Sequence, residues 1–369
     1  MEYRQRRLIA AVVLVLSLFI VAYLVFFTPS EENIPTPTAT AALENSALSW
    51  TPLPVATETD IKRTAEAADA ARDMTPSTGV DSSASPAGMR EPAPMPEWMG
   101  RIESSPVNTI CPGAASRHVP VANAQELTQA LETAQAGDQI VLAPGKYAGN
   151  FSISASGEQG KQIWICGPRE AVIDSGGPAN GTALLITGSM VGVWGISVTN
   201  AQTGILVDGG TQVQIDYVAV STTGGAGIAF QSNASDGVVQ DSLIHHTGLT
   251  AGSSGVGVSV GAPAGASSDE LDQNDNMRIS RTRIWDTAAE SIRVREGSTG
   301  GLLDYNSFDG TAMTTGDSWV DLRGNEYVVR GNVGVGSPGD GFQTHNVGNL
   351  GWGKQNTFTM NTVQLDGPG

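Results

Sequence analysis

The sequence has few charged residues, few aromatic residues and only two cysteines. Of its 369 residues 15% are charged and 6% are aromatic, and 37 acidic residues outnumber 20 lysines and arginines. The net charge of −17 argues against a nucleic-acid-binding protein, because phosphate binding needs a basic surface. Glycine, by contrast, is abundant at 45 residues, and together with many short β-branched runs it predicts a β protein rich in turns.

One long apolar run stands near the N-terminus. Residues Leu8–Phe27 form a stretch of 20 residues, which is long enough to cross a bilayer as a helix. Arg4, Arg6 and Arg7 precede this run, so the positive-inside rule places residues 1–7 in the cytoplasm and the rest of the chain outside the cell. A cleaved signal peptide is the alternative, but the apolar run is longer than a usual signal core and no A-x-A-like site follows. We therefore expect an uncleaved anchor over residues 8–27 of a single-pass membrane protein.

The segment after the anchor differs in composition from the remainder of the chain. Residues 28–106 are dominated by proline, alanine, serine and threonine without a sustained apolar period, which predicts a disordered linker. The folded domain is expected over residues 107–369. Both cysteines, Cys111 and Cys166, then lie on the oxidising side of the membrane, where a disulfide between the start of the domain and its first strands is expected. Two buried thiols are the alternative.

The folded domain begins with one helical pattern and continues as a repeat. In "NAQELTQALETAQAGD" the apolar residues Leu127, Ala130, Leu131 and Ala134 form one stripe, which predicts a helix that covers the open end of the repeat. After it, segments with three short strands each recur, and one corner position of the repeat can be followed along the chain. That position is Ile196, Val218, Ser242, Thr282, Asn306, Asn332 and Asn361.

A step of about two dozen residues with three strands per step is typical of a solenoid, in which each strand pairs with its counterpart one coil away. The asparagines in the last three coils predict a ladder of side-chain amides at the corner. A β-sandwich is the alternative architecture, but its strands would not recur on one template.

These segments resemble the right-handed parallel β-helix proteins of the pectate lyase type over about residues 120–369. The resemblance rests on "VANAQELTQALETAQAGDQIVLAPGKY", "ESIRVREGSTGGLLDYNSFDGT", "DSWVDLRGN" and "DGFQTH". It implies an all-β, single-stranded right-handed parallel β-helix with an N-terminal capping helix. It also implies a polysaccharide lyase that acts on an acidic polysaccharide. In such enzymes arginine or calcium neutralises the substrate carboxylate, and calcium stays open as a cofactor here.

Two columns of outward-facing residues are expected along the first strand of the coils. We place Asp208, Gln231, Ser259, Arg295, Arg323 and His345 in one column, and Leu206, Ala229, Gly257, Arg293, Asp321 and Gln343 in the other. Of the 11 lysines and arginines after Pro120, seven lie between Arg278 and Arg330. Two like charges on adjacent strands repel by about 3 kcal/mol at an effective dielectric of 20, so a compensating charge is required.

The compensation has two interpretations. Asp321, Glu296 and Asp317 form a surface lattice of salt bridges in the first, and an anionic ligand lies across the strands in the second. For a uronate polysaccharide, β-elimination needs a cation at the carboxylate, a base at C5 and an acid at the leaving oxygen. The resemblance implies an arginine base and points to Arg295 and Arg323, whereas His345 titrates in the useful pH range.

We therefore predict three catalytic residues and four that bind substrate. The catalytic residues are Arg295, Arg323 and His345, and the substrate-binding residues are Arg293, Asp321, Gln343 and Trp352. Two other functions stay open, namely a non-catalytic carbohydrate-binding or adhesion module and a hydrolase that uses Asp317, Asp321 and Asp340.

One insertion interrupts the repeat between Ser242 and Thr282. It carries Asp269, Glu270, Asp272 and Asp275, which predict either a calcium site or, as we favour, a solvated acidic loop.

Overall fold

The computed structural model describes residues 111–262, 271–346 and 351–365. The expected cytoplasmic tail, membrane anchor and linker lie outside these residues. Within the described ranges no helix is both long and apolar enough to cross a membrane.

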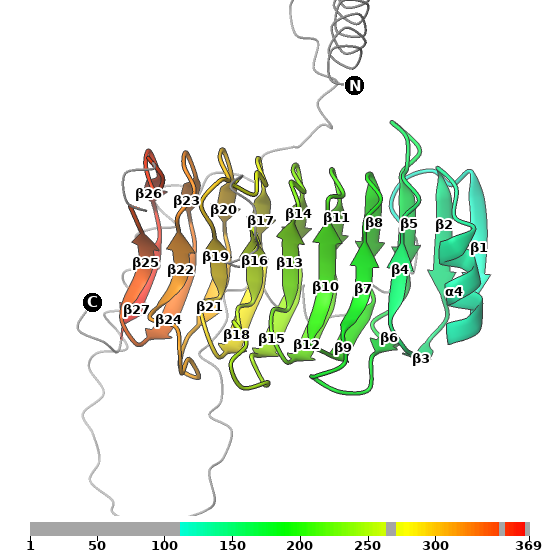
Figure 1. Ribbon diagram of the computed structural model, residues 1–369, viewed down its shortest axis with the longest axis horizontal. Helices are drawn as coiled ribbons and strands as arrows, with labels where there is room; N and C mark the ends of the chain where they lie inside the picture. The colour runs from blue at the N-terminus through cyan, green and yellow to red at the C-terminus, as the bar shows by residue number, and fades with distance from the viewer. Residues whose placement is uncertain (1–110, 263–270, 347–350, 366–369) are drawn as a thin grey trace, which may run out of the picture. The chain divides into compact units, whose positions relative to one another are not determined.

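Three parallel sheets run along the domain (Figure 1). The 10-stranded sheet A consists of β1 (Arg117–Val121), β2 (Asp138–Leu142), β5 (Ile163–Cys166), β8 (Val191–Trp194), β11 (Gln214–Asp216), β14 (Val238–Gln240), β17 (Arg278–Ser280), β20 (Leu302–Asp304), β23 (Val328–Arg330) and β26 (Thr357–Thr359). The 9-stranded sheet B consists of β3 (Gly145–Ala148), β6 (Ala171–Asp174), β9 (Ser197–Ala201), β12 (Ala219–Thr223), β15 (Leu243–Thr247), β18 (Arg283–Thr287), β21 (Ser307–Asp309), β24 (Val333–Ser337) and β27 (Thr362–Leu365). The 8-stranded sheet C consists of β4 (Phe151–Ile153), β7 (Thr182–Ile186), β10 (Thr203–Asp208), β13 (Ile228–Gln231), β16 (Val258–Val260), β19 (Ile292–Val294), β22 (Ser318–Leu322) and β25 (Asp340–Thr344).

Strand order and register confirm the predicted solenoid of right-handed type. Each complete coil contributes one strand to each sheet, and neighbouring strands of a sheet come from successive coils and pair in parallel. Ala219 pairs with Leu243 and Leu243 pairs with Arg283, so the insertion between the last two leaves the register of sheet B intact. The chain is therefore threaded as the repeat in the sequence predicts, with strand pairing between coils rather than within them.

The core is one continuous column of apolar side chains inside the three sheets. On sheet C the inward residues Ile205, Val207, Ile228 and Phe230 are fully buried, and they alternate with partly exposed residues on the outer face. This alternation follows from the period of two in a β-strand. Every second residue of sheet C therefore lies on the outer face of that sheet, where the candidate site is found.

Helix α4 (Ala124–Glu132) precedes the first full coil and lies beside β1 and β2 in Figure 1. The side chain of Asn123 accepts a hydrogen bond from the Glu126 amide at 3.0 Å, and the Glu126 carboxylate accepts one from the Ala122 amide at 2.7 Å. This reciprocal arrangement satisfies two backbone donors at the start of the helix. Its predicted apolar stripe is confirmed, because Leu127 and Leu131 are buried in the same core as the strands.

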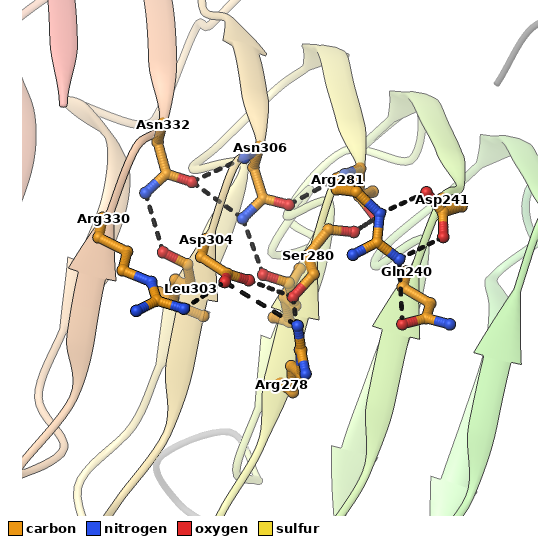
Figure 2. Close-up of polar contacts among 12 residues, drawn as sticks. Gln240, Asp241, Arg278, Ser280, Arg281, Leu303, Asp304, Asn306, Arg330 and Asn332 are labelled. Carbon is orange, nitrogen blue, oxygen red and sulfur yellow. Dashed lines mark hydrogen bonds and ion pairs between the residues drawn. The ribbon is translucent and has the colours of Figure 1, made fainter. Parts of the chain in front are cut away.

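The predicted ladder at the corner between sheets A and B is confirmed. Figure 2 shows Asn332 accepting hydrogen bonds from the backbone amide and the side-chain amide of Asn306, at 2.8 and 3.0 Å. Asn306 in turn accepts from the Thr282 amide at 3.0 Å, and Asn361 accepts from Asn332 in the same way. Each asparagine side chain thus satisfies two backbone groups of the preceding coil, an amide at the corner and a carbonyl of the sheet A strand before it, and the ladder holds the corner in place.

The predicted disulfide is present between Cys111 and Cys166, whose Cα atoms are 5.6 Å apart. Both cysteines are buried, and they pack with Trp164 and Trp194 on the outer face of sheet A. The bond closes a loop across 55 residues, which restricts the unfolded chain and stabilises the start of the domain.

Candidate functional site

The candidate site lies on the outer face of sheet C, where two columns of outward residues run across the coils. The first column is Leu206, Ala229, Ser259, Arg293, Asp321 and Gln343, as the strand register shows. The second is Asp208, Gln231, Gly261, Arg295, Arg323 and His345, because the amides of the last four residues bond to carbonyls one coil earlier.

The predicted columns are correct in every coil except one. Ser259 was expected beside Arg295 and Gly257 beside Arg293, but both assignments are wrong by two residues. Ser259 pairs with Arg293, and Gly261 lies between Gln231 and Arg295. A Cβ atom on Gly261 would come within 2.8 Å of the Arg295 Cβ, so glycine gives the arginine stem its space.

Asp321 is the centre of the site. It is 2% exposed, and its Oδ2 atom lies 3.2 Å from Arg323 and 3.9 Å from Arg293. The other oxygen, Oδ1, lies 2.6 Å from Nδ1 of His345. One buried carboxylate therefore joins a residue from each of three successive coils, and the repulsion expected between these cations is offset at this point.

A second acid that the sequence interpretation missed completes the charge balance. Glu290, which is 5% exposed in the turn before β19, forms a salt bridge with Arg293. Glu296 and Asp317 were expected in this role, and neither forms a salt bridge with the two columns among the described residues. The side chain of Glu290 reaches the column from a turn, so the alternation along a strand gives no sign of it.

Arg295 differs from its neighbours in the environment of its charge. Within the described ranges no carboxylate lies within salt-bridge distance of it, and its Nε atom is buried without a hydrogen-bond partner. Burial, and then the positive charges of Arg293 and Arg323, hold the pKa of Arg295 below its ordinary value. The guanidinium nevertheless stays charged at neutral pH, since arginine titrates far above it. It is the cation of the site with most to gain from an anion.

His345 contacts Asp321 through Nδ1, and its second ring nitrogen, Nε2, does not take part in this contact. An ionised carboxylate only accepts hydrogen bonds, so the contact at 2.6 Å fixes the proton of a neutral imidazole on Nδ1 and leaves Nε2 as an acceptor. Half of the His345 side chain is exposed, at 49%. This is the arrangement of a histidine that can take up a proton from a ligand on the surface.

The remaining predicted residues lie around this centre. The Gln343 side chain donates to Asp340 at 3.1 Å, and its buried Oε1 atom has no hydrogen-bond partner among the described residues. Trp352 is half-buried in the loop after β25, and the amide of the following Gly353 donates to the Arg323 carbonyl at 3.0 Å. The backbone directly after Trp352 therefore lies beside the second column.

The acids of the insertion have structural roles where they are described. Asp272 accepts hydrogen bonds from the amides of Ser232, Asn233 and Ala262, at 3.0, 2.6 and 2.8 Å. Asp275 accepts from the Thr299 amide at 2.7 Å, whereas Asp269 and Glu270 lie outside the described residues. In the part of the chain that the structure describes, no three histidines, cysteines or acids are grouped to hold a metal.

The oxygens of Asp321 also do not suit calcium. They face two arginines and a histidine, which would oppose a divalent cation. The described acids of the site therefore do not fit a calcium ion, and we derive no step through one.

A second set of paired charges, which sequence reasoning missed, lies on the outer face of sheet A (Figure 2). Arg281 forms two hydrogen bonds with Asp241, at 2.7 and 2.5 Å, and Arg330 lies 3.1 Å from Asp304. Arg278 lies 3.9 Å from the same Asp304 oxygen. Arg281 directly precedes the ladder residue Thr282, so its position at a corner, though not its partner, could have been read from the repeat in the sequence. Each of the three arginines faces a carboxylate here, which favours a structural role.

Asp216, which borders this set, predicts a dependence of stability on pH. Burial, together with the charge of Asp241 and against the hydrogen bond from Gln240, raises its pKa to about 6. Between about pH 4 and 6 the folded protein then binds more protons than the unfolded chain, so this contribution to stability falls as pH rises. Replacing Asp216 by asparagine removes this pH-dependent contribution. From pH 4 to pH 7 we expect the free energy of unfolding of Asp216→Asn to rise by about 1–3 kcal/mol relative to that of wild type.

Urea denaturation of both proteins at the two pH values measures this difference. Burial lowers the pKa of His245 to about 4, which gives the opposite sign in a similar pH range. That contribution is common to both proteins and cancels in the comparison. An unchanged difference between variant and wild type at pH 4 and 7 would show that Asp216 has an ordinary pKa.

Comparison with known proteins connects this geometry to one family. No family model matches the chain, and no curated protein matches its sequence. Among solved structures, the alginate lyase from Paenibacillus sp. str. FPU-7 is 36% identical, with a TM-score of 0.65 over 68% of this chain and 88% of that one.

Two other solved structures are less similar. Pectate lyase Pel9A is 16% identical, with a TM-score of 0.47 over 69% of this chain and 78% of that one. PfbA, a surface adhesin of Streptococcus pneumoniae, is 9% identical, with a TM-score of 0.37 over 66% of this chain and 75% of that one. With the identity and coverage of the first comparison, the chain belongs to the family of the Paenibacillus alginate lyase, among the parallel β-helix proteins of the pectate lyase-like type.

Proposed function

We propose that the outer face of sheet C binds an acidic, uronate-containing polysaccharide and cleaves it by β-elimination. The observation that carries the proposal is the alignment of Arg295, Arg323 and His345 in one column, with the buried Asp321 beside them. Kinship with an alginate lyase supports the same reaction class, because alginate is a polymer of uronates.

Each group of the column has a role in this reaction. Arg295 and Arg323 neutralise the substrate carboxylate, which lowers the cost of the negative charge that develops when the C5 proton leaves. Nε2 of His345 takes that proton, the electron pair forms the C4–C5 double bond, and the bond from C4 to the leaving oxygen breaks. The leaving oxygen then takes up a proton, from the imidazolium or from water. Asp321 holds the imidazole in orientation and stabilises its protonated form.

Histidine suits the role of base better than arginine does. Burial and neighbouring cations lower the pKa of Arg295, but an arginine still loses its proton far above neutral pH. The Nε2 atom of His345 has no hydrogen-bond partner among the described residues, and the half-exposed side chain can present it to a ligand. The arginine base implied by the resemblance is therefore replaced in our proposal by His345, with the arginines as electrostatic groups.

The absorbance of the unsaturated product tests the proposal directly. The full chain, purified in mild detergent, is incubated with alginate, pectate, hyaluronan and chondroitin, each with calcium and with a chelator. We expect a rise in ultraviolet absorbance with at least one polymer, and no requirement for calcium. A flat trace with all four, from protein with an intact fold, would contradict the lyase.

One observation favours a second function, that of a non-catalytic binding module. Asp321, as the salt-bridge interpretation predicted, and Glu290, which it did not predict, already form salt bridges with Arg293 and Arg323. Salt-sensitive binding of a polymer without any product would support this function. The hydrolase is less favoured, since Asp321 faces cations rather than a second carboxylate.

We also propose that the domain is displayed outside the cell on a membrane anchor over Leu8–Phe27. The apolar length of this segment and the arginines before it support the proposal. Protease treatment of intact cells tests it, because an external domain is degraded while a cytoplasmic one is protected.

A further inference from the structure

The outer face of sheet C has two halves of different chemistry. All cations of the two columns lie on or directly after β19, β22 and β25, at Arg293, Arg295, Arg323 and His345. Strands β4, β7, β10, β13 and β16 contain no lysine or arginine at all. A polymer that runs along the sheet would pass from a cationic half to a half without cations.

In the half without cations, three apolar residues stand in the first column between Ser152 and Ser259, and the second column carries the acid Asp208. Leu185, Leu206 and Ala229 stand side by side in successive coils, outward and partly exposed. Asp208 lies in the second column, two residues after Leu206. Asp272, in addition, is held by hydrogen bonds to the amides that follow β13.

This half is therefore unsuited to a substrate carboxylate. A carboxylate over Leu206 or Ala229 would lose water and meet no lysine or arginine of these strands, and Asp208 would repel it. A neutral pyranose has apolar C–H faces that gain from contact with leucine and alanine side chains. The cationic half thus favours a charged sugar, and the half without cations favours an uncharged sugar next to it on the polymer.

We propose that the substrate is a polymer in which charged uronates are separated by neutral sugars, rather than a continuous polyuronate. The inference rests on the proposed function of the cationic half and adds the class of sugar bound beside it. A uronate occupies the coils of Arg295 and Arg323, and uncharged sugars occupy the coils of Leu185, Leu206 and Ala229.

A pair of polymers that differ only in charge tests the inference. One is alginate, and the other is the same alginate with a part of its carboxyl groups reduced to primary alcohols. We expect the reduced polymer to bind more tightly and to give a several-fold higher kcat/KM per remaining uronate. A preference for the fully charged alginate in both measurements would overturn the inference.

A variant with an added cation sharpens the test. Ala229→Lys places an ammonium group in the column of Arg293, two strands away. We expect it to bind fully charged alginate several-fold more tightly and to lose the preference for the reduced polymer. Val333→Lys, an equally half-buried outward position on sheet B, is the control and should leave both affinities unchanged. An Ala229→Lys protein with wild-type affinities would also overturn the inference.

The two proposals fail in different ways. If no polymer yields product, the lyase is contradicted, while the affinities of the two polymers still decide whether the half without cations favours neutral sugars. If product forms from both polymers at equal rates and with equal affinity, the lyase stands and this inference is wrong.

Discussion

Arg295→Ala is expected to lower kcat for elimination by about 100- to 1,000-fold, the loss typical of removing one preorganised electrostatic group. Arg295 is the cation of the column whose charge is least compensated, since its buried Nε atom has no hydrogen-bond partner in the described part of the chain. A substrate carboxylate is therefore its natural counter-ion, and the interaction strengthens as negative charge develops at C5. The rate of absorbance increase at saturating substrate measures the effect.

The fold is expected to survive this substitution, because no described carboxylate depends on Arg295. Arg323→Ala does not separate catalysis from stability, since it removes a partner of the buried Asp321. Gln231→Ala, in the same column two strands earlier, is the matched control and should keep nearly full activity. Arg295→Lys keeps the charge without the planar donor group and should fall between wild type and alanine. Wild-type turnover of Arg295→Ala, with an unchanged thermal midpoint, would remove Arg295 from the reaction.

Asn332→Ala is expected to lower the free energy of unfolding by about 3–5 kcal/mol, since it removes the side-chain partner of two backbone groups inside the stack. The Asn332 side chain accepts from the Asn306 amide and donates to the Leu303 carbonyl at 2.9 Å. Water does not replace these bonds, because Asn332 is fully buried. Equilibrium denaturation in guanidinium chloride measures the difference.

Asn361→Ala provides the control for the position in the ladder. Asn361 makes the corresponding bonds to Asn332 and to the Val329 carbonyl, but it is partly exposed. Water can reach the groups that it leaves, so we expect less than half of the effect of Asn332→Ala. A cost below about 1 kcal/mol for Asn332→Ala, within the range of an average hydrogen bond, would show that the ladder does not stabilise the corner.

The fold was predictable because its signals repeat along the chain. The corner residues from Ile196 to Asn361 recur with the register that the sheets show, and the alternation of Ile292, Arg293 and Val294 assigns the inner and outer faces. The failure at Ser259 has a physical reason. Alternation with a period of two distinguishes the faces of a strand but not a shift by two residues, and the glycine-rich turn before β16 gives no other reference.

The site was predictable only where its residues lie on strands. Arg295, Arg323 and His345 follow strands in register and were placed in one column from the sequence. Glu290 reaches the column from a turn, and Arg281 adopts a positive φ of 45° at a corner. The direction of such side chains depends on the local backbone rather than on a period, so no pattern in the sequence indicates their partners.

The intact register across the insertion after β16 has a consequence for how such proteins diverge. Leu243 and Arg283 pair as neighbours although 40 residues separate them in sequence, because the strands on either side of the insertion keep their places in the stack. Loops at this border of sheet C can therefore lengthen or shorten in related proteins without a compensating change in the core. Selection is free to reshape the rim of the binding face while the stacked strands below, and the charges they carry, stay the same.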